Sequence, residues 1–237
     1  MSGAWLVLPT YNEAENIDAL VRAALPRLEA TGLGHRVLIV DDGSPDGTGR
    51  VADELAAELE PVQVLHRARK EGLGRAYLAG FAVALDGGAD LVLEMDSDFS
   101  HDPADLPRLI AAAGAADLVL GSRYVPGGAI RDWGVVRRLL SRGGSAYARV
   151  ILGVPVRDLT GGFKCFNRRV LEAIDLAGVQ ADGYGFQIEL TYRAVKAGFS
   201  VAEVPIVFRE RQRGTSKMTL RIALEAVWKV PALRFRA

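Results

Sequence analysis

The stretch Leu91-Val92-Leu93-Glu94-Met95-Asp96-Ser97-Asp98 is the most informative part of this chain. Its apolar run predicts a buried strand that ends in two carboxylates one residue apart. Alternate side chains of an extended chain share a face, so Asp96 and Asp98 are expected to point the same way. Two adjacent like charges repel unless a cation or a shared proton intervenes, and Mg²⁺ or Mn²⁺ prefers such oxygen ligands. The stretch favours a divalent-metal site, although Asp-Ser-Asp is also typical of a solvated turn.

Two strands nearer the N-terminus also end in polar residues. The first, Trp5–Leu8, stops at Pro9-Thr10-Tyr11-Asn12-Glu13, and the second, Arg36–Val40, ends in Asp41-Asp42-Gly43-Ser44. Periodicity predicts further strands at 62–65, 91–95 and 117–120, and helices at 16–30, 46–59, 72–85 and 103–113. This alternation predicts an α/β fold, a mostly parallel sheet flanked by helices in a single domain. Ligands of such sheets bind beyond the carboxyl ends of the strands, so the three polar segments should share one rim.

Composition narrows the function classes. The chain has 237 residues, of which 49% are hydrophobic, enough for a sizeable core. Its 29 basic and 29 acidic residues balance, so the whole molecule has no strong preference for nucleic acid. The one cysteine, Cys165, excludes an intramolecular disulfide framework and fits a reducing cytosol. No stretch approaches the roughly 20 apolar residues of a spanning helix, which predicts a soluble or membrane-peripheral protein.

Basic residues gather in the second half of the chain. If Val135–Leu152 is helical, Arg138, Arg142 and Arg149 fall within about 40° of one another, opposite an apolar side. A solvated basic surface is one interpretation of this face. Contact with phosphate or with a membrane surface is the other.

The C-terminal part offers a second basic cluster. Arginines alternate at 209, 211 and 213 after an apolar strand expected at Val204–Phe208, and Gly214-Thr215-Ser216-Lys217 follows. Arginine forks and a lysine suit a diphosphate, although charges on an edge strand also protect against aggregation. Beyond them, Thr219–Pro231 is an amphipathic candidate, either for a bilayer interface or for packing on the core.

Several of these motifs, in this order, resemble the family-2 inverting glycosyltransferases. Within that family the chain is most similar to the polyprenol-phosphate (dolichol-phosphate) mannose synthases, over residues 4 to 220. The motifs that many sugar transferases share are the segments 8–13, 40–48 and 96–101, and the sharper ones are 121–124, 137–143, 158–164, 182–187 and 214–217. The resemblance implies a GT-A fold and transfer of mannose from GDP-mannose to a polyprenyl phosphate with a divalent metal, Mg²⁺ or Mn²⁺.

The resemblance also implies roles for individual residues. Asp96 and Asp98 match the metal and diphosphate motif, and Asp98 is expected to be catalytic. The expected nucleotide-sugar contacts are Pro9, Tyr11, Glu13, Asp42, Asp96 and Lys217. Arginines that handle the donor and acceptor phosphates are expected at Arg123, Arg137, Arg138 and Arg211, with Arg123, Arg138 and Arg211 catalytic; the choice between Arg137 and Arg138 is open by one position.

The resemblance further implies an organisation and a location. We expect a glycosyltransferase domain over residues 1–220, with a nucleotide-sugar half at about 1–120 and an acceptor half at about 121–220, followed by an amphipathic segment at 221–237. Several members of the family carry transmembrane helices beyond the catalytic domain. This chain shows none, so the expectation is a cytoplasmic protein, peripheral at the cytoplasmic face of a membrane and held there by its basic face, its terminal segment or a membrane-anchoring partner protein.

Two rival functions are open at this point. A transferase of UDP-glucose or UDP-GlcNAc to the same lipid phosphate would share the fold, because base and sugar choice depend on a few loop contacts. A non-catalytic nucleotide-sugar-binding scaffold would retain the rim without turnover. The combination of a metal motif with an acceptor clamp argues against the scaffold, since a pure binder needs fewer of these groups.

Overall fold

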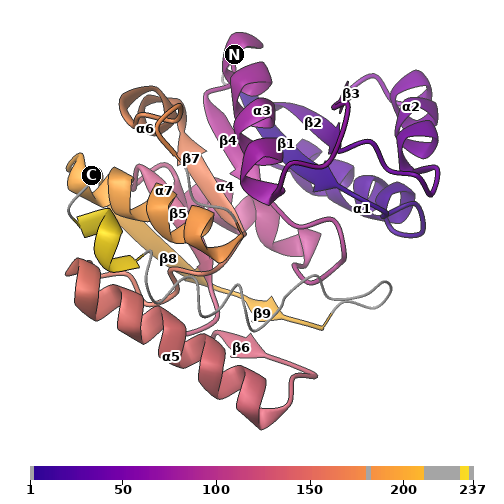
Figure 1. The fold of residues 1–237 in the computed structure, drawn as a ribbon. Coiled ribbons are helices and arrows are strands. Elements are labelled where there is room, and N and C mark those ends of the chain that lie inside the picture. Colours follow the sequence, from indigo (N-terminus) through magenta and orange to yellow (C-terminus); the bar gives the residue numbers. More distant parts are fainter. Residues whose placement is uncertain (1–2, 180–182, 211–229, 235–237) are drawn as a thin grey trace.

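The computed structural model describes residues 3–179, 183–210 and 230–234 (Figure 1). Its elements follow in chain order, with the 3₁₀ helix labelled η1. They are β1 (Gly3–Thr10), α1 (Ile17–Glu29), β2 (Gly34–Asp41), α2 (Thr48–Glu58), β3 (Val62–His66), α3 (Leu73–Asp86), β4 (Leu91–Glu94), η1 (Pro103–Asp105), α4 (Leu106–Ala112), β5 (Leu118–Ser122), β6 (Ala129–Ile130), α5 (Val135–Leu152), β7 (Lys164–Asn167), α6 (Arg168–Ala173), α7 (Tyr184–Lys196), β8 (Val201–Pro205) and β9 (Val207–Phe208).

Seven strands form one sheet in the order β3-β2-β1-β4-β7-β5-β8. All neighbours pair in parallel except β7, which is antiparallel to both β4 and β5. The predicted mostly parallel α/β sheet in a single domain is confirmed. Strands from both halves of the chain share this sheet. A second, two-stranded parallel pair joins β6 to β9.

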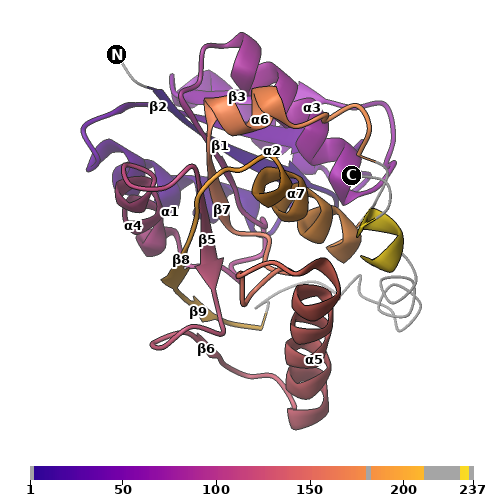
Figure 2. The ribbon, with the colours of Figure 1, turned by 90° about the vertical axis from the view of Figure 1, so that its left-hand side faces the viewer.

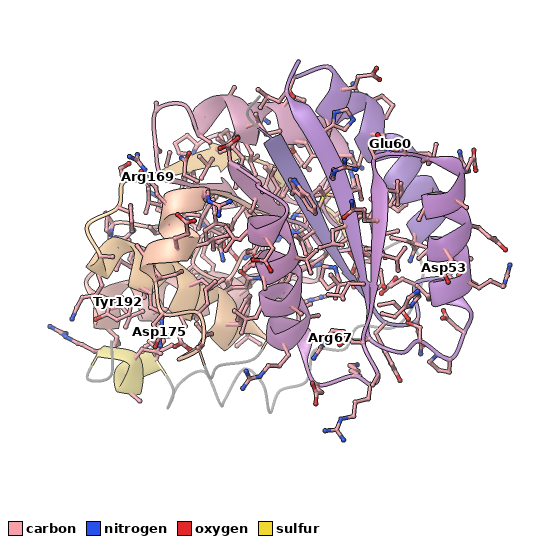
Figure 3. All side chains as sticks on the ribbon, turned by 90° about the horizontal axis from the view of Figure 1, so that it is seen from above. Asp53, Glu60, Arg67, Arg169, Asp175 and Tyr192 are labelled. Carbon is pink, nitrogen blue, oxygen red and sulfur yellow. The ribbon has the colours of Figure 1, made fainter. Side chains whose placement is uncertain are left out.

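Hydrophobic side chains cover both faces of the sheet, because alternate residues of each strand point to opposite sides. On one face, Leu6 and Leu8 of β1 pack with residues of α1, α2 and α4. On the other, Trp5 and Val7 pack with residues of α3, α6 and α7. Figures 2 and 3 show the helices on the two sides of the sheet and the side chains that fill the space between the layers.

The structure corrects two expected strands. β4 ends at Glu94, so Asp96 and Asp98 lie in the loop that follows it and not in extended chain. The expected strand Val204–Phe208 is divided at Ile206 into β8 and β9. The backbone N–H of Ile206 donates to the carbonyl of Ser122, and its own carbonyl accepts from Ala129, so this residue is where the chain passes from one sheet to the other.

The helix α5 has the predicted bounds and continues through Gly143-Gly144. It forms the lower edge of the molecule in Figures 1 and 2. In the part of the chain that the structure describes, no helix combines the length and the apolar character that crossing a bilayer requires. Of the expected terminal segment 221–237, only residues 230–234 are described, and Val230 and Leu233 are buried in the core.

Candidate active site

The three polar segments meet at one rim, because β2, β1 and β4 are adjacent in the sheet. The backbone N–H of Asp42 donates to the carbonyl of Thr10 over 3.0 Å. The Ser97 hydroxyl donates to the carbonyl of Pro9 over 2.9 Å. These bonds join the ends of β1, β2 and β4 directly, as the sequence predicts for a parallel sheet.

The β1–β2 side of the rim combines an aromatic ring, a lysine ammonium and a buried carboxylate. The ammonium of Lys70 lies 4.2 Å from the centre of the Tyr11 ring. Glu13 is buried and accepts a hydrogen bond from the side-chain amide of Asn16 over 2.8 Å. A half-exposed aromatic ring beside hydrogen-bonding carboxylates has the chemistry to hold a nucleoside, through stacking and contacts to its polar edge.

Asp42 is the buried acid of this side. Burial raises the pKa of its carboxyl group, while the hydrogen bond from Arg67 opposes that rise. The Arg67 guanidinium contacts the carboxylate at 2.5 Å and also bonds Glu71, at 2.8 Å. Figure 3 labels Arg67 beyond one end of β3, with Glu60 beyond the other. Asp42 is thereby held in a fixed orientation at the carboxyl end of the sheet.

Residues 95–102, which follow β4, form a loop that we call the acidic loop. Its two aspartates differ in exposure. Asp98 is buried and its carboxylate accepts the backbone N–H of Ser100 over 3.0 Å, whereas the Asp96 side chain is 33% exposed. Between them and Ser100 the chain turns at Phe99, whose φ of 59° lies in the left-handed region. His101 is buried behind Asp96, with Nε2 3.5 Å from Oδ2. The loop therefore presents one accessible and one sheltered carboxylate.

This pair fits a divalent cation that completes its shell with substrate. Within the described ranges, no group of three His, Cys, Asp or Glu side chains could form a metal cage. Mg²⁺ is commonly held by only one or two carboxylates, together with water and substrate phosphates. Asp96 and Asp98 supply that number of hard oxygen ligands, so the donor set suits Mg²⁺ or Mn²⁺ bound together with a diphosphate.

A buried ion pair lies directly beneath the acidic loop. Glu94, two residues before Asp96, is opposite Lys164 in the antiparallel β4–β7 pair, and their charged atoms are 3.1 Å apart. The Lys164 ammonium also donates to the backbone carbonyl of Gln187 over 3.2 Å and to its side-chain oxygen. Burial raises the pKa of Glu94 and lowers that of Lys164. The pair couples the strand that carries the acidic loop to β7 and α7.

The structure places Arg123 in a paired, buried position at the end of β5. Its guanidinium bonds both carboxylate oxygens of Asp158, over 2.7 and 2.6 Å, and the Thr160 hydroxyl over 2.8 Å. It also lies 5.3 Å from the centre of the Phe208 ring. Its charge is balanced by Asp158, so its clearest role in this structure is to hold the end of β5 against the loop before β7.

Arg137 and Arg138 have different surroundings on α5. The Arg137 guanidinium is 2.6 Å from Glu210 and 4.0 Å from the centre of the Trp133 ring. Arg138 is exposed, and its guanidinium donates to the backbone carbonyl of Trp133 over 3.2 Å. The surroundings therefore favour Arg138 as the arginine that meets an incoming anion. The expected residues Arg211 and Lys217 lie outside the described residues.

The chain matches the family model described as glycosyl transferase family 2 over residues 5–175. The chain belongs to glycosyl transferase family 2. It is 50% identical to the polyprenol monophosphomannose synthase of Mycolicibacterium smegmatis over 230 residues, 95% of this chain and 84% of that relative. It is 47% identical to the undecaprenyl-phosphate mannosyltransferase of Micrococcus luteus over 227 residues, 94% of this chain and 90% of that relative.

Solved structures share the fold of this family-2 glycosyltransferase. The glucosyl-3-phosphoglycerate synthase of Mycobacterium tuberculosis in complex with phosphoglyceric acid superposes with a TM-score of 0.72 at 22% identity, covering 99% of this chain and 80% of that one. The same enzyme with Mn²⁺, uridine diphosphate and phosphoglyceric acid gives a TM-score of 0.70 at 23% identity, covering 99% and 78%. At this identity the likeness establishes the fold alone.

Sequence reasoning did not assign the partners that fix this glycosyltransferase site. Asp158 and Lys164 belong to motifs that carry the family resemblance, yet neither had a role. A signal was present for Lys164, because a single charge inside the apolar run Phe163-Lys164-Cys165-Phe166 requires a buried partner. Glu94 is likewise the one charged residue in the apolar run Leu91–Met95, and its charge is opposite to that of Lys164.

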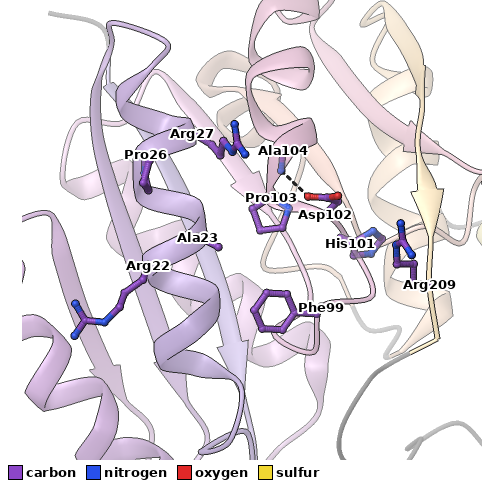
Figure 4. A pocket seen from close by; sticks show the side chains of 10 residues that line it. All are labelled: Arg22, Ala23, Pro26, Arg27, Phe99, His101, Asp102, Pro103, Ala104 and Arg209. Carbon is purple, nitrogen blue, oxygen red and sulfur yellow. Dashed lines mark hydrogen bonds between the residues drawn. The ribbon is translucent and has the colours of Figure 1, made fainter.

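A groove of about 630 Å³ opens beside His101, on the side of the loop that faces α1. Phe99 and His101 line it together with Arg27 and Arg209, as Figure 4 shows. Of the arginines expected at 209, 211 and 213, only Arg209 belongs to the described residues. Its backbone N–H donates to the carbonyl of Ser100 over 3.1 Å. Arg209 lies next to the acidic loop.

Proposed function

We propose that this chain transfers mannose from GDP-mannose to a polyprenyl phosphate with inversion at the sugar, giving polyprenyl phosphate mannose. One observation carries the proposal: the two relatives named for this mannosyl transfer align with 95% and 94% of the chain at 50% and 47% identity. The expected donor residues that the structure describes, Pro9, Tyr11, Glu13, Asp42 and Asp96, lie at one rim, and this supports the proposal. The low-identity neighbours support the fold but not the choice of sugar or base.

On the donor side, Tyr11, Glu13 and Asp42 would hold the nucleoside, with Pro9 shaping the end of β1. Asp96 and Asp98 would hold Mg²⁺ or Mn²⁺, which supplies charge neutralisation for the departing diphosphate. The buried Glu94–Lys164 pair would keep the acidic loop in place while substrates exchange, since its atoms are linked to β7 and α7. Lys217 and Arg211 are proposed to assist at the phosphates, as the resemblance implies.

On the acceptor side, no strong general base is required. The second pKa of a phosphate monoester is near 6, so a phosphate oxygen of the lipid is ionised and nucleophilic at neutral pH. The task of the chain is to hold two anions in line against their mutual repulsion. Arg138 is exposed and suited to contact the acceptor phosphate. Arg123 would act from its bond to Asp158, by positioning the end of β5.

The proposed lipid substrate also implies where in the cell the protein works. A polyprenyl phosphate resides in a bilayer, so a chain whose described residues lack a spanning helix would work as a peripheral protein at the cytoplasmic face. A membrane-anchoring partner protein is compatible with that location.

The test is product formation from a soluble acceptor. Purified protein is incubated with Mn²⁺, radiolabelled GDP-mannose and a short-chain polyprenyl phosphate, and the lipid products are separated. UDP-glucose and UDP-GlcNAc are compared at equal concentration. We expect a mannosyl lipid from GDP-mannose only. Faster transfer from either uridine donor would replace the mannose assignment, and binding of GDP-mannose without any product would favour the scaffold.

Arg138→Ala tests the acceptor contact. Loss of a charge-assisted contact to the phosphate should lower kcat/KM for the short-chain acceptor by about 10²-fold. Arg149→Ala is the matched control, because Arg149 is an exposed arginine on the same side of the same helix. Equal rates for the two variants would remove Arg138 from the acceptor site.

A further inference from the structure

The two aspartates of the acidic loop are held in different ways. Asp98 accepts the backbone N–H of Ser100, whereas the Asp96 carboxylate lies against side chains. Three side chains around it, Tyr77, His101 and Gln187, are buried, with exposures of 0%, 1% and 2%. Each carries a polar atom that makes no hydrogen bond to any described residue. Buried polar groups are normally paired, so three unpaired groups around one carboxylate call for a common explanation.

The His101 ring is fixed by aromatic packing. Its centre lies 5.0 Å from that of Phe163 and, edge to face, 5.1 Å from that of Phe208. Its Nε2 atom lies 3.5 Å from Oδ2 of Asp96, slightly longer than a normal hydrogen bond. A neutral imidazole with its proton on Nε2 can therefore donate to Asp96 after a small shift of either side chain.

Tyr77 approaches the same carboxylate from α3. Its ring is stacked on Phe186 of α7, with the ring centres 5.9 Å apart and the planes 4° from parallel. Its hydroxyl is buried and faces Asp96. Burial, followed by the charge of Asp96, raises the pKa of Tyr77 well above its ordinary value. The hydroxyl therefore keeps its proton at neutral pH and is available as a donor.

Gln187 supplies the third polar group from α7. Its side-chain oxygen accepts from the Lys164 ammonium, which leaves its amide nitrogen for another acceptor. A β-carbon at position 162 would lie 3.4 Å from this nitrogen and 3.5 and 3.6 Å from the two carboxylate oxygens of Asp96. Because Gly162 has no such atom, the amide and the carboxylate border the same small space.

We propose that Tyr77, His101 and Gln187 are positioning residues that hold the Asp96 carboxylate toward the divalent metal and the diphosphate of the nucleotide. This inference rests on the proposed function, which requires a metal-dependent donor site. Groups that hydrogen-bond a metal ligand orient it, and loss of one typically costs about 10–100-fold in metal affinity. Tyr77 and Gln187 come from α3 and α7, so the metal site depends on both halves of the chain.

The experiment measures Mn²⁺ binding with GDP present and, in parallel, with UDP, without sugar or acceptor. Electron paramagnetic resonance follows free Mn²⁺. We expect Tyr77→Phe and His101→Leu each to weaken Mn²⁺ binding by about ten-fold or more. Neither variant should lower the melting temperature, because each removes buried polar atoms that make no hydrogen bond to a described residue. A purely structural role would predict the opposite pair of results.

Two variants are the controls. His101→Gln keeps an N–H donor beside Asp96 and should retain most of the Mn²⁺ affinity. Tyr192→Phe removes the hydroxyl of another buried tyrosine, further toward the C-terminal end of α7, and should bind Mn²⁺ like the original chain. Nucleotide binding in EDTA, measured by calorimetry, should be equal for all variants, because the positioning residues act through the metal.

The outcomes separate this inference from the proposed function. Unchanged Mn²⁺ affinity in both Tyr77→Phe and His101→Leu would overturn it, as would an equal loss of nucleotide binding with and without metal. If the original chain transfers mannose while these variants bind Mn²⁺ normally, the positioning role fails and the proposed function stands. If the variants lose Mn²⁺ affinity as expected but the original chain makes no mannosyl lipid, the positioning role stands and the proposed reaction fails.

Discussion

Replacing Lys164 by Met should destabilise the fold strongly, although the change removes no apolar contact. Lys164 and Glu94 are both 0% exposed in their side chains and face each other across the β4–β7 pair at 3.1 Å. Within the described residues, Glu94 has no other ion-pair partner. Lys164→Met therefore leaves a carboxyl group in the core beside an apolar side chain.

The size of the loss follows from desolvation. Removing one partner of a buried ion pair typically costs about 3–5 kcal/mol, because the remaining charge is uncompensated. Burial already raises the pKa of Glu94, and loss of the ammonium removes the attraction that opposes this rise. The loss for Lys164→Met should therefore lie in this range. For a chain of 237 residues, the melting temperature should fall by about 6–20 °C.

The assay is urea unfolding at pH 7, followed by far-ultraviolet circular dichroism. Arg50→Met is the matched control, because Arg50 forms an exposed pair with Glu54 at 2.6 Å and its loss should cost no more than about 0.5 kcal/mol. Glu94→Leu/Lys164→Met removes both charges together. This double variant should be more stable than Lys164→Met alone, since buried pairs can be exchanged for apolar residues at little cost.

Two results would refute this reasoning. A loss for Lys164→Met as small as that for Arg50→Met would mean that Glu94 finds compensation elsewhere. The single variant Glu94→Leu completes the set. A double variant whose loss equals the sum of the losses for Lys164→Met and Glu94→Leu would mean that Glu94 and Lys164 do not stabilise one another. Either outcome would also remove the argument that this pair supports the acidic loop.

Three further predictions concern single groups. Asp98→Asn should lower mannosyl transfer by about 10²–10³-fold with little change in melting temperature, and a chelator should abolish transfer by the original chain, as a radiolabel assay measures. Hydrogen bonds from Ser200 lower the pKa of Asp117, so its stabilisation is complete above the unfolded pKa and disappears as pH falls through the folded one. Asp117→Asn should therefore lose about 1.5–3 kcal/mol at pH 7 and progressively less as the pH falls below the ordinary range of a carboxyl pKa, in urea unfolding at a series of pH values. Burial raises the pKa of Cys165 to about 12, so its thiol should react with Ellman's reagent at pH 8 only after denaturant is added.

The rim of the site was predictable because it depends on local pattern. A short apolar run such as Trp5–Leu8 followed by polar residues identifies both a strand and its end, and the rule for parallel sheets then brings the ends together. The prediction that Asp96 and Asp98 share a face of a strand used the wrong geometry, since β4 stops at Glu94 and the chain turns at Phe99. Their closeness in sequence still brings both to the rim.

The strand β7 could not be predicted in the same way. It has four residues, Lys164–Asn167, and it begins with a charge, so its pattern is too short to identify a strand. Its place between β4 and β5 is fixed by partners far away in sequence. The bond from Arg123 to Asp158 spans 35 residues and is equally invisible to local pattern.

The partners of Arg123 and Arg138 indicate different roles for the two arginines. Both carboxylate oxygens of Asp158 already accept from the Arg123 guanidinium inside the core, so turning that guanidinium toward a substrate would leave a buried carboxylate without its charge partner. Arg138 can turn toward a substrate without this cost, because its guanidinium bonds a backbone carbonyl and its side chain is exposed. An incoming lipid phosphate should therefore be met first by Arg138 on α5, while Arg123 keeps the end of β5 where the acidic loop needs it.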